Sequence, residues 1–220
     1  MSGYFRNQHH EFDPVWHVQV AMLLALSLQL LLPDTFTFGL HYILPWVEGL
    51  LIISLSLTTP RARTFKSLRR RINVITLIAT ITVANIYSLI VIADHLLRPG
   101  IISDGKPLIL SAINIFMTNI IIFALWYWEM DGGGPGERME IEKHDQDFLF
   151  AQHRNELYKH PKWKPAFADY LYISAVNAMS FSPGDALPLS RRAKMLMLSQ
   201  AIVSLVTIFL VAARAVGILS

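Results

Sequence analysis

Residues 108–128 read LILSAINIFMTNIIIFALWYW, and this stretch, which contains no charged residue, decides the fold class. An α-helix rises 1.5 Å per residue, so about 20 apolar residues are enough to cross a bilayer. The apolar residues are continuous rather than alternating, which excludes a strand of a membrane β-barrel. The sequence therefore predicts an all-α, polytopic membrane protein.

Four further apolar runs have the length of a membrane-spanning helix, at residues 15–32, 38–57, 72–97 and 195–219. The flank HHEFDP before the first run contains no Lys or Arg, and no small-residue cleavage site follows the run. We therefore interpret it as a retained helix rather than a signal peptide. The prediction is a single integral membrane domain, residues 1–220, with five spanning helices. Four of them lie in the region 15–128.

The composition of the whole chain fits this class. Apolar residues make up 53% of the 220 residues and charged residues 16%, against about 25% in a typical soluble domain. The chain contains no cysteine, which excludes a disulfide scaffold, and its apolar content excludes a disordered chain. The net charge of +3 would suggest nucleic-acid binding in a soluble protein. Here membrane topology explains the basic residues first, so we expect the lipid bilayer as partner and no nucleic acid.

Lys and Arg are distributed unevenly over the connections between the runs. Residues 1–14, 58–71 and 129–168 together contain thirteen of the nineteen, whereas residues 98–106 contain two. Cytoplasmic connections of membrane proteins carry the excess of basic residues. The N-terminus and both basic connections are therefore predicted to be cytoplasmic.

Residues 129–166 form a predicted charged cytoplasmic loop. It opens with DGGGPG directly after three aromatic residues, so we expect the glycines to turn the chain out into water. Two groups of histidines and acids, at 9–17 and 153–160, lack a recognised metal-ligand spacing, and we interpret them as solvated or headgroup-facing. The chain contains no phosphate-binding glycine loop, nucleophile elbow or paired catalytic carboxylates. We therefore predict no enzyme, no catalytic residue, no cofactor and no metal site.

The stretch FADYLYISAVNAMSFSPGDALPLSRR at 167–192 differs from the five long runs. Its apolar part, residues 168–179, is too short to span a bilayer and has the length of a re-entrant helix. Irregular backbone follows, which at membrane depth must be covered by protein or face a water-filled cavity. We therefore predict a re-entrant segment at 168–183 within the C-terminal unit 167–220. Six spanning helices are the alternative, if residues 167–188 cross the membrane.

A short helix, an irregular loop and a long helix together resemble the pore module of potassium channels, whose filter is Thr-Val-Gly-Tyr-Gly-Asp. The filter positions are occupied here by Ser180, Phe181, Ser182, Pro183, Gly184 and Asp185. Gly184 and Asp185 fit the motif, whereas Ser182 and Pro183 replace its first glycine and its tyrosine. Proline fixes φ and cannot copy the alternating backbone of a potassium filter. The resemblance therefore implies a pore-like shape without potassium selectivity.

Longer phrases resemble a family of uncharacterised bacterial integral membrane proteins. They are FALWYWEMDGGGPG at 123–136, DFLF at 147–150, DYLY-x5-AMSFSPGDALPLSRRAKMLM at 169–197 and SLVTIFLVAARAVGIL at 204–219. The resemblance implies a bacterial cytoplasmic (inner) membrane and a relation to channel-like pore modules. It supplies no reaction and no ligand.

Polar residues within the apolar runs are candidates for function, because charge is costly at membrane depth. The charged candidates are Glu48, Asp94 and Arg214. We expect Asp94 and Arg214 to lie at similar depth near the outer side, where they could pair. The neutral candidates are Asn177, Gln200, Ser204 and Thr207. They either line an aqueous path or make hydrogen bonds between helices, and the sequence leaves both roles open.

These features predict a channel-like or transport-related membrane protein with a non-potassium filter. Gly184 and Asp185 would form the pore mouth, and Asn177 would support the loop. A pore of this type needs several copies around an axis, so we expect a homo-oligomer, a tetramer by analogy alone. The alternative is a non-conducting membrane scaffold that uses the loop 129–166 as a docking surface.

Overall fold

The computed structural model describes residues 15–33, 46, 49–50, 53, 68–97, 105–135, 137–138, 146–154 and 163–219. These residues are mostly helical, as the sequence predicts. In chain order the elements are α1 Val15–Leu30, α3 Leu68–Leu97, α4 Gly105–Met130, η3 Asp131–Gly133, β1 Phe148–Phe150, α5 Ala151–Arg154, α6 Phe167–Ser180, β2 Ala186–Pro188 and α7 Arg191–Leu219. The predicted helix at 38–57, with Glu48, lies almost wholly outside the described residues.

Three of the described helices, α3, α4 and α7, are long and apolar enough to cross a membrane. They coincide with the predicted runs at 72–97, 108–128 and 195–219, and each extends a few residues further at a polar end. The helix α1 is also apolar but has 16 residues, which is shorter than a full span. The prediction of a helical protein with membrane-length helices is therefore confirmed.

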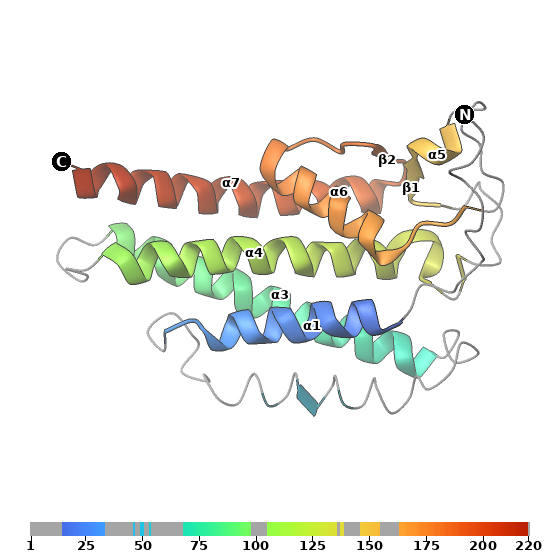
Figure 1. The fold of residues 1–220 in the computed structure, drawn as a ribbon, viewed down its shortest axis with the longest axis horizontal. Coiled ribbons are helices and arrows are strands. Elements are labelled where there is room, and N and C mark those ends of the chain that lie inside the picture. The colour runs from blue at the N-terminus through green and yellow to red at the C-terminus, as the bar shows by residue number, and fades with distance from the viewer. Residues whose placement is uncertain are drawn as a thin grey trace, which may run out of the picture.

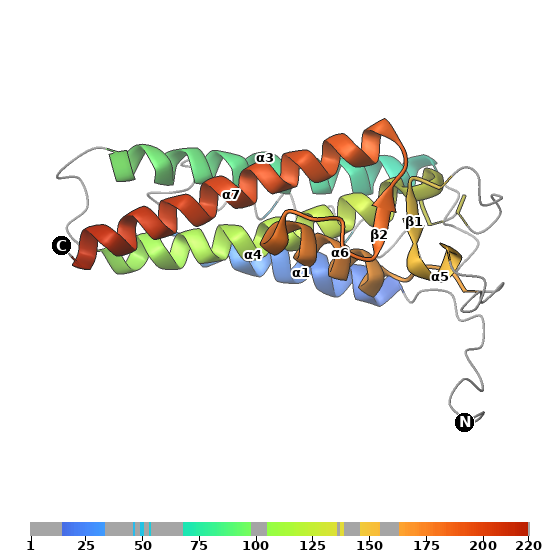
Figure 2. The same ribbon diagram turned by 90° about the horizontal axis from the view of Figure 1, so that it is seen from above.

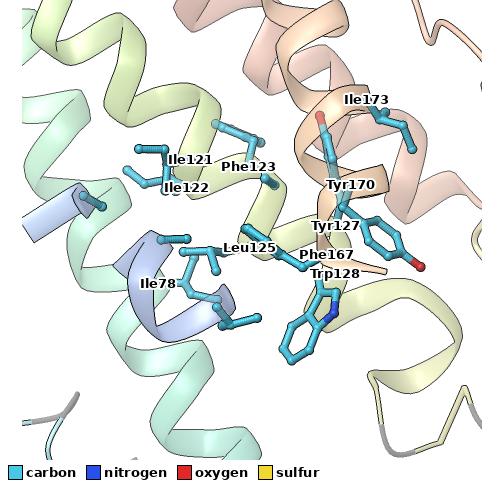
Figure 3. Close-up of a cluster of buried hydrophobic side chains, with 14 of the residues drawn as sticks. Ile78, Ile121, Ile122, Phe123, Leu125, Tyr127, Trp128, Phe167, Tyr170 and Ile173 are labelled. Carbon is cyan, nitrogen blue, oxygen red and sulfur yellow. The ribbon is translucent and has the colours of Figure 1, made fainter. Parts of the chain in front are cut away.

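The helix α4 lies at the centre of the described bundle, where it packs against α1, α3, α6 and α7. In its most apolar window 72% of the residues are buried, against 22% in that of α7. Figure 3 shows Ile121 and Ile122 of α4 beside Ile78 of α3, with Tyr170 and Ile173 of α6 on the other side. The apolar side chains of α4 therefore form the protein core, whereas most of those on α7 face outward.

The helices α1, α3 and α7 run in one direction and α4 runs in the opposite direction (Figure 1). Val15, Leu68 and Arg191, which begin the three parallel helices, therefore lie at the same end of the bundle as Met130, where α4 finishes. We call this the basic end, because residues 69–71 and the first turn of α7 carry Arg and Lys there. Figure 2 shows α7 crossing the bundle at an angle.

The helix α6 begins at the basic end and runs along α4 and α7 toward the opposite end. After Ser180 the chain reverses, and β2 returns to the basic end, where it pairs with β1 (Figures 1 and 2). The antiparallel register places Phe148 opposite Pro188 and Phe150 opposite Ala186. This small sheet was not predicted. Three-residue strands carry too little sequence pattern to be recognised, and pairing with a distant segment stabilises them.

Candidate functional site

The loop between α6 and β2 carries the residues at the predicted filter positions. Its exposed residues are Ser180, Phe181, Ser182, Gly184 and Asp185, and Pro183 is half-buried. Phe181 ends α6 in the left-handed region, with φ 53°, and its backbone N–H donates to the Asn177 carbonyl oxygen at 3.1 Å. Gly184 has φ 61°, and a Cβ there would lie 3.1 Å from Val176 Cγ1. The loop is therefore a tight, exposed turn that is tied to the end of α6 and requires glycine at position 184.

A buried cluster of neutral side chains joins α4, α6 and α7, and we call it the amide cluster. It consists of Tyr127, Ser174, Asn177 and Gln200, each at most 3% exposed. Asn177 Nδ2 donates to Gln200 Oε1 at 2.8 Å and to the Met197 carbonyl oxygen at 3.0 Å. The Tyr127 hydroxyl donates to the same Gln200 oxygen at 2.5 Å. One acceptor on α7 thus receives a donor from α6 and another from α4.

Gln200 and Ser174 make further hydrogen bonds within the amide cluster. Gln200 Nε2 donates to the hydroxyl and carbonyl oxygens of Ser174, at 2.7 and 2.9 Å. The Ser174 hydroxyl in turn donates to the Ile120 carbonyl oxygen of α4 at 2.6 Å. Buried polar groups are costly unless they are paired, so this cluster stabilises one arrangement of the three helices.

The predicted neutral candidates make mainly helix–helix contacts within one copy of the chain. Asn177 and Gln200 belong to the amide cluster, and Ser204 Oγ accepts from Asn119 Nδ2 of α4 at 2.9 Å. Thr207 is buried, and its hydroxyl donates to the Val203 carbonyl oxygen of its own helix at 2.7 Å. A role of these residues in an aqueous path stays a prediction.

A second buried cluster lies at the basic end and centres on Asp131, directly after α4. Asp131 is fully buried, and its Oδ1 accepts from the backbone N–H groups of Asp147 and Phe148, at 2.8 and 3.2 Å. Its Oδ2 accepts from the hydroxyl of Tyr170, which is also fully buried, at 2.5 Å. The three hydrogen bonds stabilise the carboxylate away from water. They connect the end of α4 to β1 and to α6.

Arg138 completes this Asp131 cluster. Its Nη1 donates to the carbonyl oxygens of Trp128 and Asp131, at 2.9 and 3.2 Å. Its guanidinium lies 5.0 Å from the centroid of the Tyr170 ring, within the range of a cation–π contact. Arg138 is 6% exposed, so the positive charge is held beside the buried carboxylate.

Gly132, Gly133 and Gly134 make the turn that brings Arg138 back to the bundle. Their φ values are 56°, 80° and 102°. Such positive values are accessible to glycine and strained for other residues. A Cβ on Gly134 would also lie 3.1 Å from the Glu129 carbonyl oxygen. The glycines therefore fold the chain back onto α4, whereas the sequence led us to expect them to turn it out into water.

An ion pair connects α3 to the end of α4. Arg70 Nη2 lies 3.5 Å from Glu129 Oε2, and both side chains are at most 2% exposed. The Arg70 guanidinium also lies 5.6 Å from the Trp128 ring centroid. Glu129 and Asp131 were expected in a solvated loop, so their burial corrects that expectation. The carboxylates of Glu129 and Asp131 are stabilised by Arg70 and by hydrogen bonds, respectively, rather than by hydration.

Two of the predicted intramembrane charges, Asp94 and Arg214, lie at the opposite end of the bundle from the Asp131 cluster. Asp94 is exposed near the end of α3, and Arg214 is half-buried near the end of α7. Arg214 Nε is buried without a hydrogen-bond partner among the described residues. An ion pair between Asp94 and Arg214 stays a prediction, and Glu48 lies outside the described residues.

The histidine groups are only partly described. His17 and His153 lie in the described ranges, whereas His9, His10 and His160 do not. His153 Nε2 lies 3.5 Å from the Trp163 carbonyl oxygen, and its ring contacts that of Phe150. Within the described ranges no group of three His, Asp or Glu side chains could hold a metal ion.

The Asp131 cluster is the part of the site that sequence reasoning missed. The run of three glycines after an apolar helix was the available signal, because consecutive glycines often make a turn that no other residue can adopt. That signal identifies the turn but not the partners of Asp131, which come from residues 147–148 and 170.

Comparison with known proteins finds no match to a protein-family model, to a curated protein or to a solved structure.

Proposed function

We propose that the chain is a channel-like or transport-related protein of the bacterial inner membrane, with a non-potassium filter and a cytoplasmic N-terminus. It has five spanning helices, a re-entrant α6, and a path lined by the loop 180–185 of several copies. The lipid bilayer and further copies of the chain are its partners.

The directions of the helices support the five-span topology. Because α1 and α3 run in parallel, the end of α1 and the start of α3 lie at opposite ends of the bundle, as a further spanning helix between them would require. Because α7 runs opposite to α4, the residues between them begin and finish at the same end. The three basic residues at the start of α7 then remain on the side that carries most Lys and Arg, as the distribution of charge requires.

One observation carries the functional proposal: the loop after α6 is exposed at the depth of the middle of α4. Ser174 bonds to the carbonyl of Ile120, which lies ten residues before the end of α4, about 15 Å along its axis. The loop 181–185 comes after the end of α6, which is further from the basic end than Ser174. A bilayer has a hydrocarbon core about 30 Å thick, so in the proposed topology the loop would lie where lipid cannot satisfy a polar backbone. Water or another protein surface must cover it.

A water-filled path between copies satisfies this requirement. In one copy the polar side chains of the amide cluster bond to each other. The hydroxyl of Ser182 and the carboxylate of Asp185 are exposed and available to water or ions. Copies arranged around an axis would bring these loops together, which gives Asp185 a direct effect on permeation.

Ion flux through reconstituted liposomes tests the proposal. We expect flux well above that of empty liposomes for the wild type, and a several-fold change for Asp185→Asn. Glu137→Gln is the matched control, because it neutralises an exposed carboxylate at the basic end, away from the loop. The proposal fails if folded, oligomeric wild-type protein produces no flux with any of the common monovalent and divalent ions.

A non-conducting membrane scaffold is the second candidate. The hydrogen bonds that Asn177, Gln200 and Ser204 make between helices favour it, because such bonds stabilise a fixed bundle. Absence of flux together with a stable oligomer would support the scaffold over the channel.

A further inference from the structure

We propose that Asp131 positions the exposed loop by holding both of its limbs, so that the segment after α4 regulates the site of the proposed function. This inference rests on the proposed function for its biological meaning. The mechanical part concerns only residues of one copy. Asp131 acts here as a positioning residue, since its contacts are with Tyr170 and with the backbone of residues 147–148.

The first limb of the loop is α6, and Asp131 holds it through Tyr170. The phenol lies in the first turn of α6 and donates to Asp131 Oδ2 at 2.5 Å. The Tyr170 ring also contacts Phe148 and Phe150, at centroid distances of 6.3 and 5.4 Å. A shift of the carboxylate therefore moves the start of α6 relative to α4 and α7.

The second limb is β2, and Asp131 holds it through β1. Asp131 Oδ1 accepts from the backbone N–H groups of Asp147 and Phe148, at the start of β1. The Asp147 carbonyl oxygen then accepts from the N–H of Leu189 at 2.8 Å, directly after β2. Gly132 N–H donates to Asp147 Oδ2 at 3.2 Å, which closes the arrangement. The return limb is thus connected to the same carboxylate by one intervening strand.

The loop between the two limbs is short. Only residues 181–185 separate α6 from β2, so a shift of both limbs has to move the loop as well. The Asp131 carboxylate is next to the turn of Gly132, Gly133 and Gly134. These glycines have positive φ values that are strained for other residues. Arg138 is held against this turn by the hydrogen bonds that it donates to the Trp128 and Asp131 carbonyl oxygens. Binding or modification that pulls on Arg138 would therefore reach the loop through Asp131.

Thiol labelling tests the coupling directly, because the chain contains no cysteine and a single Ser182→Cys substitution reports on the loop. Tyr170→Phe removes the first tie and keeps the ring. Tyr172→Phe is the matched control, because it makes the same change on the same helix at an exposed position. A buried hydrogen bond corresponds to roughly a five-fold change in an equilibrium. We expect Tyr170→Phe to change the labelling rate of Cys at 182 by about that factor, and Tyr172→Phe to leave it unchanged.

A second reporter separates repositioning from general loosening. Ser199 is exposed on α7, and among the described residues its hydroxyl bonds to its own helix, so the labelling rate of Ser199→Cys should not change. Asp131→Asn provides a second variant, since its amide retains one oxygen acceptor in place of two. The inference is overturned if neither variant changes labelling at 182, or if labelling at 182 and 199 changes equally. Labelling needs no transport, so a shift at 182 in a protein without flux would retain the coupling and remove the proposed function.

Discussion

The Asp131 cluster and the amide cluster hold the same helix, α6, in two different ways. The Asp131 cluster contains a buried carboxylate and a buried guanidinium, and it lies at the basic end of the bundle. The amide cluster lies further along α6 and contains only neutral side chains. Charge is tolerated near the membrane surface and is costly in the hydrocarbon region, whereas amides and hydroxyls pair between helices at any depth. In the proposed topology, the chemistry of each cluster therefore follows its depth.

The two clusters also differ in where their partners come from. Asp131 accepts two of its three hydrogen bonds from backbone N–H groups of the segment before β1 and of β1 itself. Gln200 is bonded mainly to side chains of α4 and α6. A shift of the segment 147–148 moves its backbone N–H groups away from Asp131. The side chains around Gln200 are carried by long helices, which hold them at a fixed spacing. This difference makes the Asp131 cluster the more sensitive of the two to a single substitution.

Asp131→Leu should have the largest effect on stability. Leucine has a similar shape but accepts no hydrogen bond, so it leaves three donors without their acceptor and removes the negative charge beside the buried Arg138. A buried donor left without its acceptor costs about 1–3 kcal/mol, so three such donors cost about 3 kcal/mol or more. We expect a loss of that size in the free energy of unfolding, measured by denaturation with SDS in mixed micelles.

Asp131→Asn is the control for this prediction, since it keeps the shape and one carbonyl oxygen. It should cost clearly less than Asp131→Leu. If Asp131→Leu unfolds at the same SDS fraction as the wild type, the carboxylate contributes nothing to stability and the contrast between the clusters is lost.

Gln200→Leu should have an intermediate effect. It removes the acceptor for Tyr127 and Asn177 and the donor to Ser174. Hydrogen bonds between membrane helices contribute about 0.6 kcal/mol each on average, so the expected loss is about 1–2 kcal/mol. Ser199→Ala on the neighbouring residue is the control, because the hydrogen bond that Ser199 makes within the described ranges is to the Met195 carbonyl of its own helix. A loss for Gln200→Leu larger than that for Asp131→Leu would reverse the order of the two clusters.

The sequence predicts the long helices and the reversal after α6 better than it predicts the site. The runs at 72–97 and 195–219 identify α3 and α7, because a continuous apolar run of that length is typical of a membrane-spanning helix. Gln200 and Asn177 could be selected as polar residues within an apolar region. Asp131 could not, because a charge beside glycines is typical of a solvated turn. Its partners in β1 become available only when residues 148–150 pair with residues 186–188, a contact that no local pattern specifies.

Ser204→Ala should have the smallest effect and sharpens the comparison within the neutral region. Ser204 is as buried as Gln200 but accepts a single side-chain hydrogen bond, from Asn119 Nδ2 at 2.9 Å. Without the Ser204 hydroxyl, Asn119 Nδ2 loses this acceptor. We therefore expect the free energy of unfolding to fall by about 0.6 kcal/mol in the same SDS titration. Ser111→Ala on α4 is a control of similar burial outside this contact. If Ser204→Ala cost as much as Gln200→Leu, burial alone and not the number of hydrogen bonds would determine stability, and the amide cluster would have no special part in holding α6.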